Sequence, residues 1–143
     1  MALRIDERLG FDIKAAEVAL MSAKSDGLRH LGVTVAQYAA LLTLREHPGI
    51  SGAGLARACL VTPQASAATL KTLESKGFVE RARDDWSRNT LTSRLTDEGA
   101  KLLGKADKVA VEVEQRVFDA LTAEERDTLR RLLTMCRSAA SRT

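Results

Sequence analysis

The chain has 143 residues, of which 45% are hydrophobic, 29% are charged and only five are aromatic. This balance is typical of one globular domain with an aliphatic core. The uncharged stretch 31–44 has 14 residues, whereas a membrane-spanning helix needs about 18 or more apolar residues. Four charged residues within 4–8 interrupt the segment where a secretory signal needs an apolar core. We therefore expect a cytoplasmic protein that has no membrane partner.

The net charge is +3, and its distribution along the chain is uneven. Between Arg57 and Arg94 there are seven basic and four acidic residues, whereas the rest of the chain has 15 of each sign. The whole positive surplus thus lies in one window, as expected for a surface that binds nucleic acid. A solvated face with no partner is the alternative interpretation.

The first part of the chain predicts three helices, from apolar residues spaced three and four apart and from residues that cap helix ends. The first helix covers about residues 6–24. Thr34 caps the second helix, which stops at 46–49. Ser51 caps a short third helix that reaches about Cys59.

A fourth helix follows a tight turn at 60–61. Thr62 supplies a capping hydroxyl directly before Pro63, and proline is well suited to the first helical position because its missing N–H has no partner there. Gly77 ends this helix after Lys76.

The helical spacing disappears after this glycine. Residues 78–83 and 90–95 are typical of two short strands around a polar loop at 84–89. Thr96 then caps a long helix, and Thr122 begins a capping box that opens the last helix.

A short helix, a turn, a separately capped helix and a basic hairpin together predict a winged helix-turn-helix. The fold class is therefore mainly α with a small β-hairpin. In this motif the second helix lies in the major groove of DNA, where base pairs show distinct hydrogen-bonding patterns, and other elements hold phosphates.

The sequence also resembles the MarR family of bacterial transcriptional regulators over nearly its whole length. The segments that carry the resemblance are 32–41, Leu55-Ala56, Val61-Thr62-Pro63-Gln64, 73–81 and Leu95-Thr96-Asp97-Glu98-Gly99. The resemblance implies an obligate dimer that binds a palindromic operator and a repression that a small ligand or an oxidant relieves. It also implies a small aromatic or lipophilic effector, expected to be an anion, in the crevice between the dimer helices and the DNA-binding lobe.

We accordingly interpret 1–143 as a single MarR-type domain, with a winged-helix DNA-binding lobe at 33–96. The segments 1–31 and 97–143 supply N- and C-terminal dimerisation helices. The last helix has an apolar stripe that one small domain cannot cover, formed by Leu129, Leu132, Leu133 and Cys136. We therefore expect a homodimer around a two-fold axis.

The fourth helix has the residues expected to meet DNA. Ala65 or Ser66, Thr69 or Leu70, and Leu73 are expected to face the core, which leaves four residues on the opposite stripe: Gln64, Ala67, Ala68 and Lys71. We expect Gln64 to bond an adenine, Ala67 or Ala68 to touch a thymine methyl group, and Lys71 to meet a phosphate. Thr62 is expected to act as the cap, and its hydroxyl is also placed to hold a phosphate.

The wing loop departs from the family pattern. The family usually has an Asp-Arg-Arg triplet there, whereas this chain has Ser87-Arg88-Asn89. Arg88 therefore carries over as the residue for the minor groove. Arg83 is expected to touch a phosphate or to pair with a neighbouring aspartate, and Trp86 to pack beneath the wing.

No motif for catalysis, a cofactor or a metal site is recognisable in the sequence. His30 and His47 have no second ligand at a suitable spacing. Cys59 and Cys136 lie on apolar stripes, which favours buried, unreactive thiols over redox sensors. We expect a DNA-binding regulator with no enzymatic activity. A winged-helix module that binds only proteins is the rival interpretation.

Overall fold

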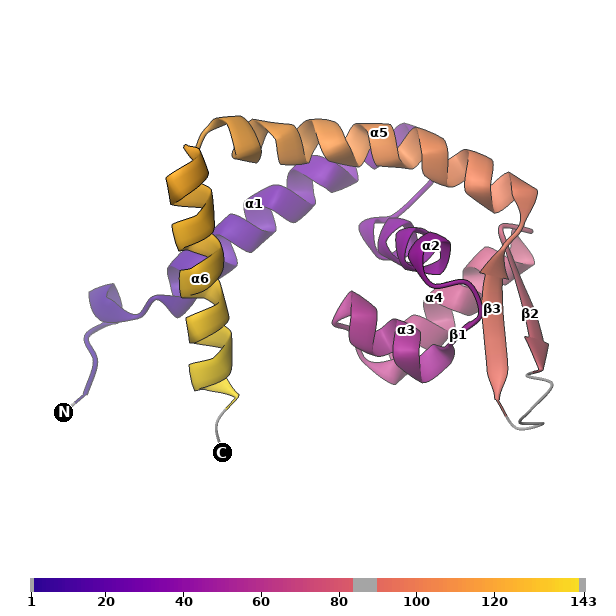
Figure 1. The fold of residues 1–143 in the computed structure, drawn as a ribbon, viewed down its shortest axis with the longest axis horizontal. Helices are drawn as coiled ribbons and strands as arrows, with labels where there is room; N and C mark the ends of the chain where they lie inside the picture. Colours follow the sequence, from indigo (N-terminus) through magenta and orange to yellow (C-terminus); the bar gives the residue numbers. More distant parts are fainter. Residues whose placement is uncertain (1, 84–89, 142–143) are drawn as a thin grey trace. The chain divides into compact units, whose positions relative to one another are not determined.

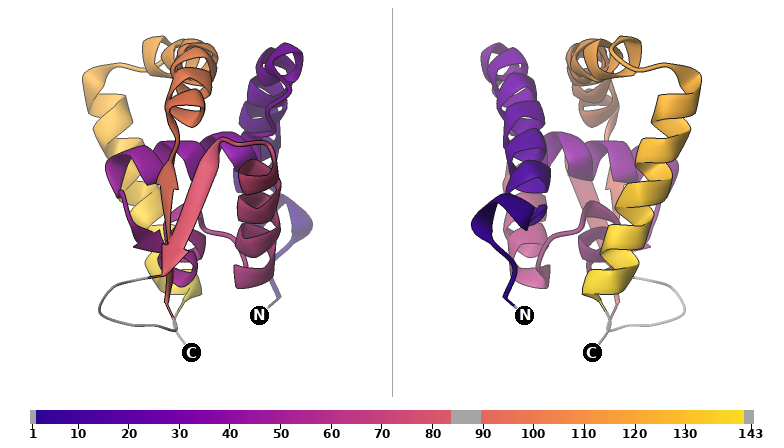
Figure 2. Two further views of the ribbon diagram at one scale, coloured as in Figure 1. Left: turned by 90° about the vertical axis from the view of Figure 1, so that its right-hand side faces the viewer. Right: turned by 90° about the vertical axis from the view of Figure 1, so that its left-hand side faces the viewer.

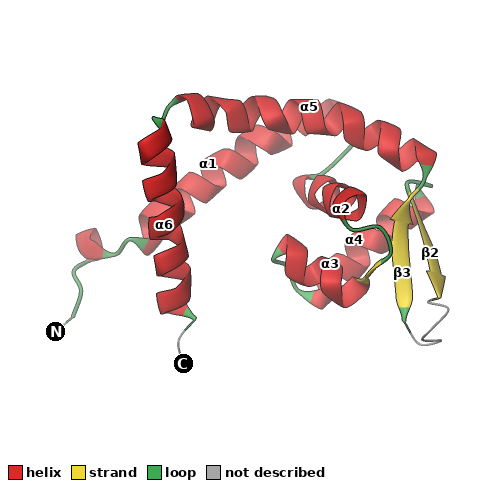
Figure 3. Ribbon diagram, in the orientation of Figure 1, coloured by secondary structure: helices red, strands yellow, loops and turns green. Residues whose placement is uncertain are grey.

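The computed structural model describes residues 2–83 and 90–141 of the chain (Figure 1). The chain divides into two compact units, residues 1–110 and 111–143. In chain order the elements are a 3₁₀ turn at Ile5–Glu7, α1 Gly10–Leu28, a 3₁₀ turn at Arg29–Leu31, α2 Val35–Glu46, β1 Ile50–Ser51, α3 Gly52–Cys59, α4 Pro63–Ser75, β2 Val79–Arg83, β3 Leu91–Leu95, α5 Asp97–Asp119 and α6 Ala123–Ala140. The fold is thus mainly helical with a small sheet, as the sequence predicts (Figure 3). None of the described helices has the length and hydropathy needed to cross a membrane.

The first unit, residues 1–110, contains the helix-turn-helix and the sheet. Its core consists of buried aliphatic side chains from α2, α3, α4 and the first part of α5. The fully buried leucines are Leu28, Leu41, Leu44, Leu55, Leu70, Leu73 and Leu103. Burial of each such side chain contributes about 1.5–3 kcal/mol to folding, so these helices share one stabilising centre.

The helices begin where the sequence places capping residues. Thr34 accepts a hydrogen bond from the backbone N–H of Gln37 at 3.1 Å, and Ser51 does the same for Gly54 at 3.1 Å. Thr96 accepts from the N–H of Gly99 at 3.1 Å at the start of α5. These bonds satisfy N–H groups that have no partner within the helix.

The sheet is antiparallel, with strand order β1, β3, β2. The β2–β3 hairpin is the one predicted from the sequence, and its register pairs Val79 with Leu95 and Arg83 with Leu91. The strand β1 was not predicted, because its two residues gain strand structure only by pairing with Ser93 and Thr92 of β3, far along the chain. Figure 2 shows the hairpin from the side, next to α4.

The first helix differs from its prediction at both ends. The backbone N–H of Arg4 donates to Glu7 at 2.8 Å and closes a separate 3₁₀ turn before α1. Gly27, which follows the predicted end of the first helix near residue 24, lies inside α1, where an added Cβ would lie 2.5 Å from Cγ1 of Val109. Glycine thus allows a close approach between α1 and the first part of α5, and the helix continues to Leu28.

The second unit, residues 111–143, contains the end of α5 and the helix α6. Thr122 and Glu125 form the predicted capping box, with hydrogen bonds of 3.2 and 2.8 Å. Arg126 fixes the turn between the helices, because its Nη1 donates to the carbonyl oxygens of Phe118 and Leu121 at 2.8 and 2.6 Å. Its guanidinium also lies 3.7 Å from the centre of the Phe118 ring.

The junction between β3 and α5 depends on Gly99, which is buried in the first turn of α5. An added Cβ there would overlap the carbonyl oxygen of Phe78. Gly104 lies in the same helix, is exposed, and has no atom within 4 Å of the equivalent position.

We therefore predict opposite effects of two identical substitutions in α5. Gly99→Ala should lower the free energy of unfolding by about 1–3 kcal/mol, because the backbone of Phe78, directly before β2, must move. Gly104→Ala should raise it by about 0.5–1 kcal/mol, because alanine favours a helix interior. Denaturant unfolding of both variants measures the difference, and a Gly99→Ala protein as stable as the wild type would contradict the close approach.

Candidate nucleic-acid interface

The turn between α3 and α4 has an unusual backbone at Leu60. Its φ of 57° lies in the left-handed region that glycine normally occupies. The N–H of Leu60 donates to the carbonyl of Arg57 at 3.3 Å, and that of Val61 donates to Ala56 at 3.1 Å. These bonds end α3 and turn the chain directly into α4.

The first turn of α4 is capped as the sequence predicts. The Thr62 hydroxyl oxygen accepts from the N–H of Ala65 at 3.1 Å, and Pro63 occupies the first helical position. This cap, together with the turn at Leu60, fixes the start of the helix whose exposed side was predicted to meet DNA.

One side of α4 is buried in the core. The buried residues are Ser66, Leu70 and Leu73, whereas Ala65 is exposed and Thr69 is half-buried. Helical spacing left two choices open for the core side of this helix. The structure buries Ser66 rather than Ala65, and Leu70 rather than Thr69.

The opposite side of α4 faces outward and has all four residues of the predicted stripe. Gln64, Ala67, Ala68 and Lys71 are each exposed. Their spacing of three and four residues aligns them along one face. The helix therefore presents an amide, two methyl groups and an ammonium in a row to a partner.

The wing is tied to the end of α4 by two contacts that the sequence did not reveal. The Thr96 hydroxyl donates to the carbonyl oxygen of Gly77 at 2.6 Å. The Arg81 guanidinium lies 3.7 Å from the carboxylate of Glu74, with 26% of the Arg81 side chain exposed. Sequence spacing gave no signal for either contact, because each depends on how the hairpin folds back on the helix.

Two arginines were predicted to bind DNA from the wing. Arg83 is exposed at the end of β2 and takes part in an interaction within the chain. Arg88 lies outside the described residues, as does Trp86. Their predicted roles therefore remain predictions.

Another group that sequence reasoning missed joins α2 to α5. The Tyr38 hydroxyl donates to Asp107 at 2.7 Å, and Arg45 reaches the other oxygen of this carboxylate at 3.4 Å. The hydrogen bond from Arg45 to Glu46, reinforced by Asp107, raises the pKa of the Arg45 guanidinium above its ordinary value. The charged guanidinium of Arg45 thus helps to hold α2 against α5.

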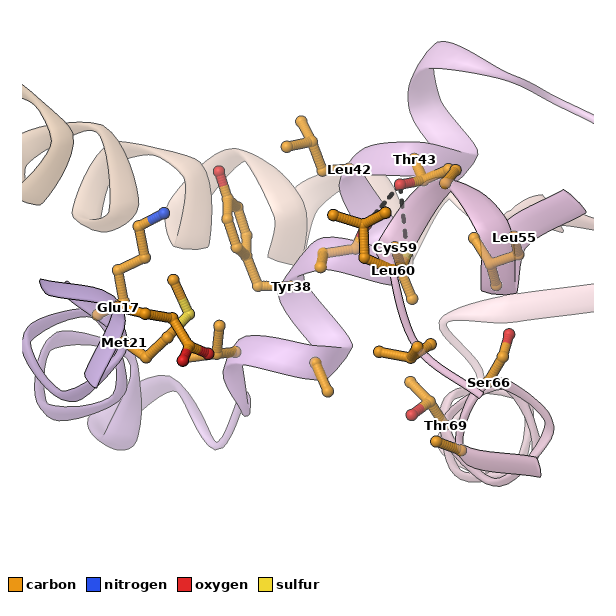
Figure 4. Close-up of a pocket in the computed structure, with 18 residues that line it drawn as sticks. Glu17, Met21, Tyr38, Leu42, Thr43, Leu55, Cys59, Leu60, Ser66 and Thr69 are labelled. Atoms are coloured by element: carbon orange, nitrogen blue, oxygen red, sulfur yellow. Dashed lines mark hydrogen bonds between the residues drawn. The ribbon is translucent and has the colours of Figure 1, made fainter. Parts of the chain in front are cut away.

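A cavity of about 610 Å³ lies within the first unit, among α1, α2, α3 and α4 (Figure 4). This volume is in the range of small-molecule sites. The apolar part of its lining includes Met21, Val35, Leu42, Leu55, Leu60 and Val61. Because Leu60 and Val61 precede the cap of α4, the cavity borders the turn that sets this helix.

The two cysteines are more accessible than predicted. Cys59 is half-buried and lines the cavity, with its sulfur 3.5 Å from the Thr43 hydroxyl (Figure 4). Cys136 is also half-buried, on α6. The expectation of buried thiols is therefore wrong for both, because each apolar stripe ends at a surface that the chain does not fully cover. In the described part of the chain, His, Cys, Asp and Glu side chains form no cluster of three or more suited to a metal ion.

Comparisons with known proteins agree with this architecture. A sequence model described as "MarR family" matches residues 31–85. The HTH-type transcriptional repressor Mb2911 of Mycobacterium bovis is 35% identical over 133 residues, which cover 93% of this chain and 96% of that protein.

Two solved structures are similar in fold and are complexes with DNA. The transcriptional repressor CouR bound to a 23-mer DNA duplex has a TM-score of 0.82 and 27% identity, over 96% of this chain and 99% of that one. A mutant of MarR from E. coli complexed with operator DNA has the same TM-score and identity, over 90% and 92% of the two chains. Relatives of this similarity, together with a capped and outward-facing α4, establish that the chain belongs to the MarR family and is a DNA-binding transcriptional regulator.

Proposed function

We propose that the protein is a homodimeric repressor that places α4 in the major groove of a pseudo-palindromic operator and loses this affinity when an effector binds. The exposed stripe of Gln64, Ala67, Ala68 and Lys71 carries the proposal, because the opposite side of the helix is buried. We place this activity in the cytoplasm and assign the chain no catalytic step.

Each residue of the stripe has a distinct proposed role. The Gln64 amide is suited to bond N6 and N7 of an adenine, and Ala67 or Ala68 to contact the methyl group of a thymine. Lys71 lies farther along the helix and would meet a phosphate. Thr62 caps α4 with its oxygen and retains a hydroxyl proton that can be donated to a phosphate.

The wing supplies charge in this proposal. Arg83 would contact the backbone, and Arg88 would enter the neighbouring minor groove, where negative potential is concentrated. The contacts of Thr96 with Gly77 and of Arg81 with Glu74 support a fixed placement of the hairpin beside α4.

The proposed dimer rests on apolar side chains that the single chain leaves exposed. On α6, Leu129, Leu132 and Leu133 are each more than 40% exposed. Exposed apolar residues are also numerous along the N-terminal part of the chain: Leu3, Ile5, Leu9, Phe11, Ile13 and Val18. Large apolar side chains exposed in such numbers are typical of a surface that binds a partner, so burial by a second copy is favoured.

The cavity in the first unit is the proposed effector site. It borders Leu60 and Val61, which lead directly into the Thr62 cap. A ligand that prefers a dimer with displaced α4 helices would lower operator affinity by the ratio of its affinities for the two forms.

A mobility-shift titration on the upstream region of the protein's own gene tests this function. Binding that exceeds affinity for random DNA of equal length supports a regulator that recognises an operator. Weak binding that is equal on both DNAs would contradict it and favour the protein-interaction module.

We predict that Gln64→Ala lowers specificity. The variant should lose about 1–3 kcal/mol of binding free energy on the operator, or roughly 5- to 150-fold in affinity, and little on random DNA. Fluorescence anisotropy on both DNAs measures this. Ser75→Ala, an exposed position near the end of α4, is the control and should bind as the wild type does.

Residues that neutralise a phosphate should affect the salt dependence of DNA binding rather than its sequence specificity. Lys71→Ala and Arg88→Ala should each weaken binding to operator and random DNA alike, and each should reduce the slope of log affinity against log salt by about one. Lys105→Ala, on the exposed side of α5, should leave the slope unchanged. An unchanged slope for Arg88→Ala would mean that the wing does not meet the DNA.

The dimer is tested by sedimentation velocity at micromolar concentration. The wild type should sediment as a dimer, and Leu133→Asp should shift it to a monomer, because a carboxylate would be buried without a partner. Thr134→Asp introduces the same charge at the next residue, outside the apolar stripe, and should remain dimeric. A monomeric wild type would contradict the proposed interface.

A further inference from the structure

We propose that the cavity among α1–α4 selects a neutral, lipophilic small molecule with a carbonyl oxygen, in preference to a carboxylate anion. The proposal rests on the effector site proposed above and specifies the chemistry of its ligand. Three features of the lining carry it: apolar walls, a buried hydroxyl without a partner, and charged side chains that are already engaged.

The walls are suited to a hydrophobic ring system. Side chains such as Met21, Leu42 and Leu55 from α1, α2 and α3, and Val61 from the turn before α4, surround a volume of about 610 Å³. A flat or branched apolar molecule would gain free energy by leaving water for such a site. The polar groups in the lining then determine which functional group the molecule has.

Ser66 is the polar group that lacks a partner. Only 3% of this residue is exposed, and its Oγ makes no hydrogen bond in the described structure. Figure 4 shows this hydroxyl directed from α4 toward Leu55, another residue of the lining. A buried hydroxyl without a partner is costly, and the carbonyl oxygen of a bound molecule would accept its proton.

Two other hydroxyls of the lining are already in use. Thr43 donates to the carbonyl of Ala39 at 2.8 Å, and Tyr38 donates to Asp107 at 2.7 Å. Thr69 also lines the cavity but is only half-buried, so the buried Ser66 hydroxyl gains most from a ligand oxygen.

The charged side chains of the lining argue against an anion. They are Glu17 and Lys24. Glu17 pairs with Lys14 at 3.0 Å, and Lys24 already takes part in an interaction within the chain. A carboxylate would lose its hydration without gaining a cation that is not already engaged, whereas a neutral amide or ketone has a much smaller cost of desolvation.

A matched pair of probes tests this preference: naphthalene-2-carboxamide and naphthalene-2-carboxylate, which share ring and carbonyl and differ in charge. By calorimetry on the full chain at neutral pH, the carboxamide should bind more tightly by at least about tenfold. Equal or tighter binding of the carboxylate would overturn the proposal, and so would binding of neither probe.

The native Cys59 reports where the probe binds, because it lines the cavity. Saturating carboxamide should slow the reaction of Cys59 with N-ethylmaleimide several-fold, followed by peptide mass spectrometry. The carboxylate at the same concentration should slow it less. Equal rates at Cys59 with and without the probe would place it elsewhere and overturn the assignment.

Ser66→Ala tests the proposed anchor. The variant should fold and melt at the wild-type temperature or above it, because it removes a buried hydroxyl without a partner. It should weaken carboxamide binding several-fold, whereas Ser75→Ala, an exposed serine of the same helix, should not. Unchanged carboxamide affinity in Ser66→Ala would overturn the role of this hydroxyl.

Operator titrations with and without the carboxamide separate this inference from the proposed function. A probe that protects Cys59 but leaves operator affinity unchanged would support the ligand class and contradict the effector role. Absent operator binding by the ligand-free protein would contradict the repressor and leave the cavity assignment standing.

Discussion

The burial of one side of α4 is the constraint on which the rest of the architecture depends. Leu70 and Leu73 are each only 1% exposed and belong to the same core as the leucines of α2, α3 and α5. Their burial contributes several kcal/mol, so rotation of the helix about its axis would be costly. Because this side of α4 is fixed in the core, Gln64 and Lys71 on the opposite side remain exposed to a partner. A change that loosens the core would therefore also disturb the surface that binds the partner.

Two close contacts fix the elements next to α4 in the same way. Thr96 bonds the carbonyl of Gly77 and caps α5, so one side chain joins the end of α4 to the start of the next helix. Gly99 allows the backbone of Phe78 to pass close to α5. At the start of α4, the cavity is lined by Leu60 of the turn and by Ser66 of the helix itself. A ligand in the cavity and DNA on the exposed stripe would therefore act on the same short segment.

Local signals in the sequence predicted most of the fold, whereas contacts between distant residues escaped it. Thr34, Ser51, Thr62, Thr96 and Thr122 cap helices as expected, because a cap depends only on the next three residues. The strand β1, the bond between Tyr38 and Asp107 and the exposure of Cys59 depend on residues that meet only in the folded chain. The outward stripe of α4 followed from helical spacing, but the role of each side chain on it depends on a partner outside the chain.

Tethered cleavage tests most directly whether the exposed stripe of α4 lies against the bases. An iron chelate would be attached to Ala68→Cys in a chain that also has Cys59→Ser and Cys136→Ser, and a mobility shift would verify that the complex forms. We expect two cleavage clusters about one helical turn apart, one for each protomer of the dimer. The same chelate at Lys105→Cys should produce little cleavage. Equal cleavage from both positions, or none from Ala68→Cys in a complex that has formed, would contradict the placement of α4 in the major groove.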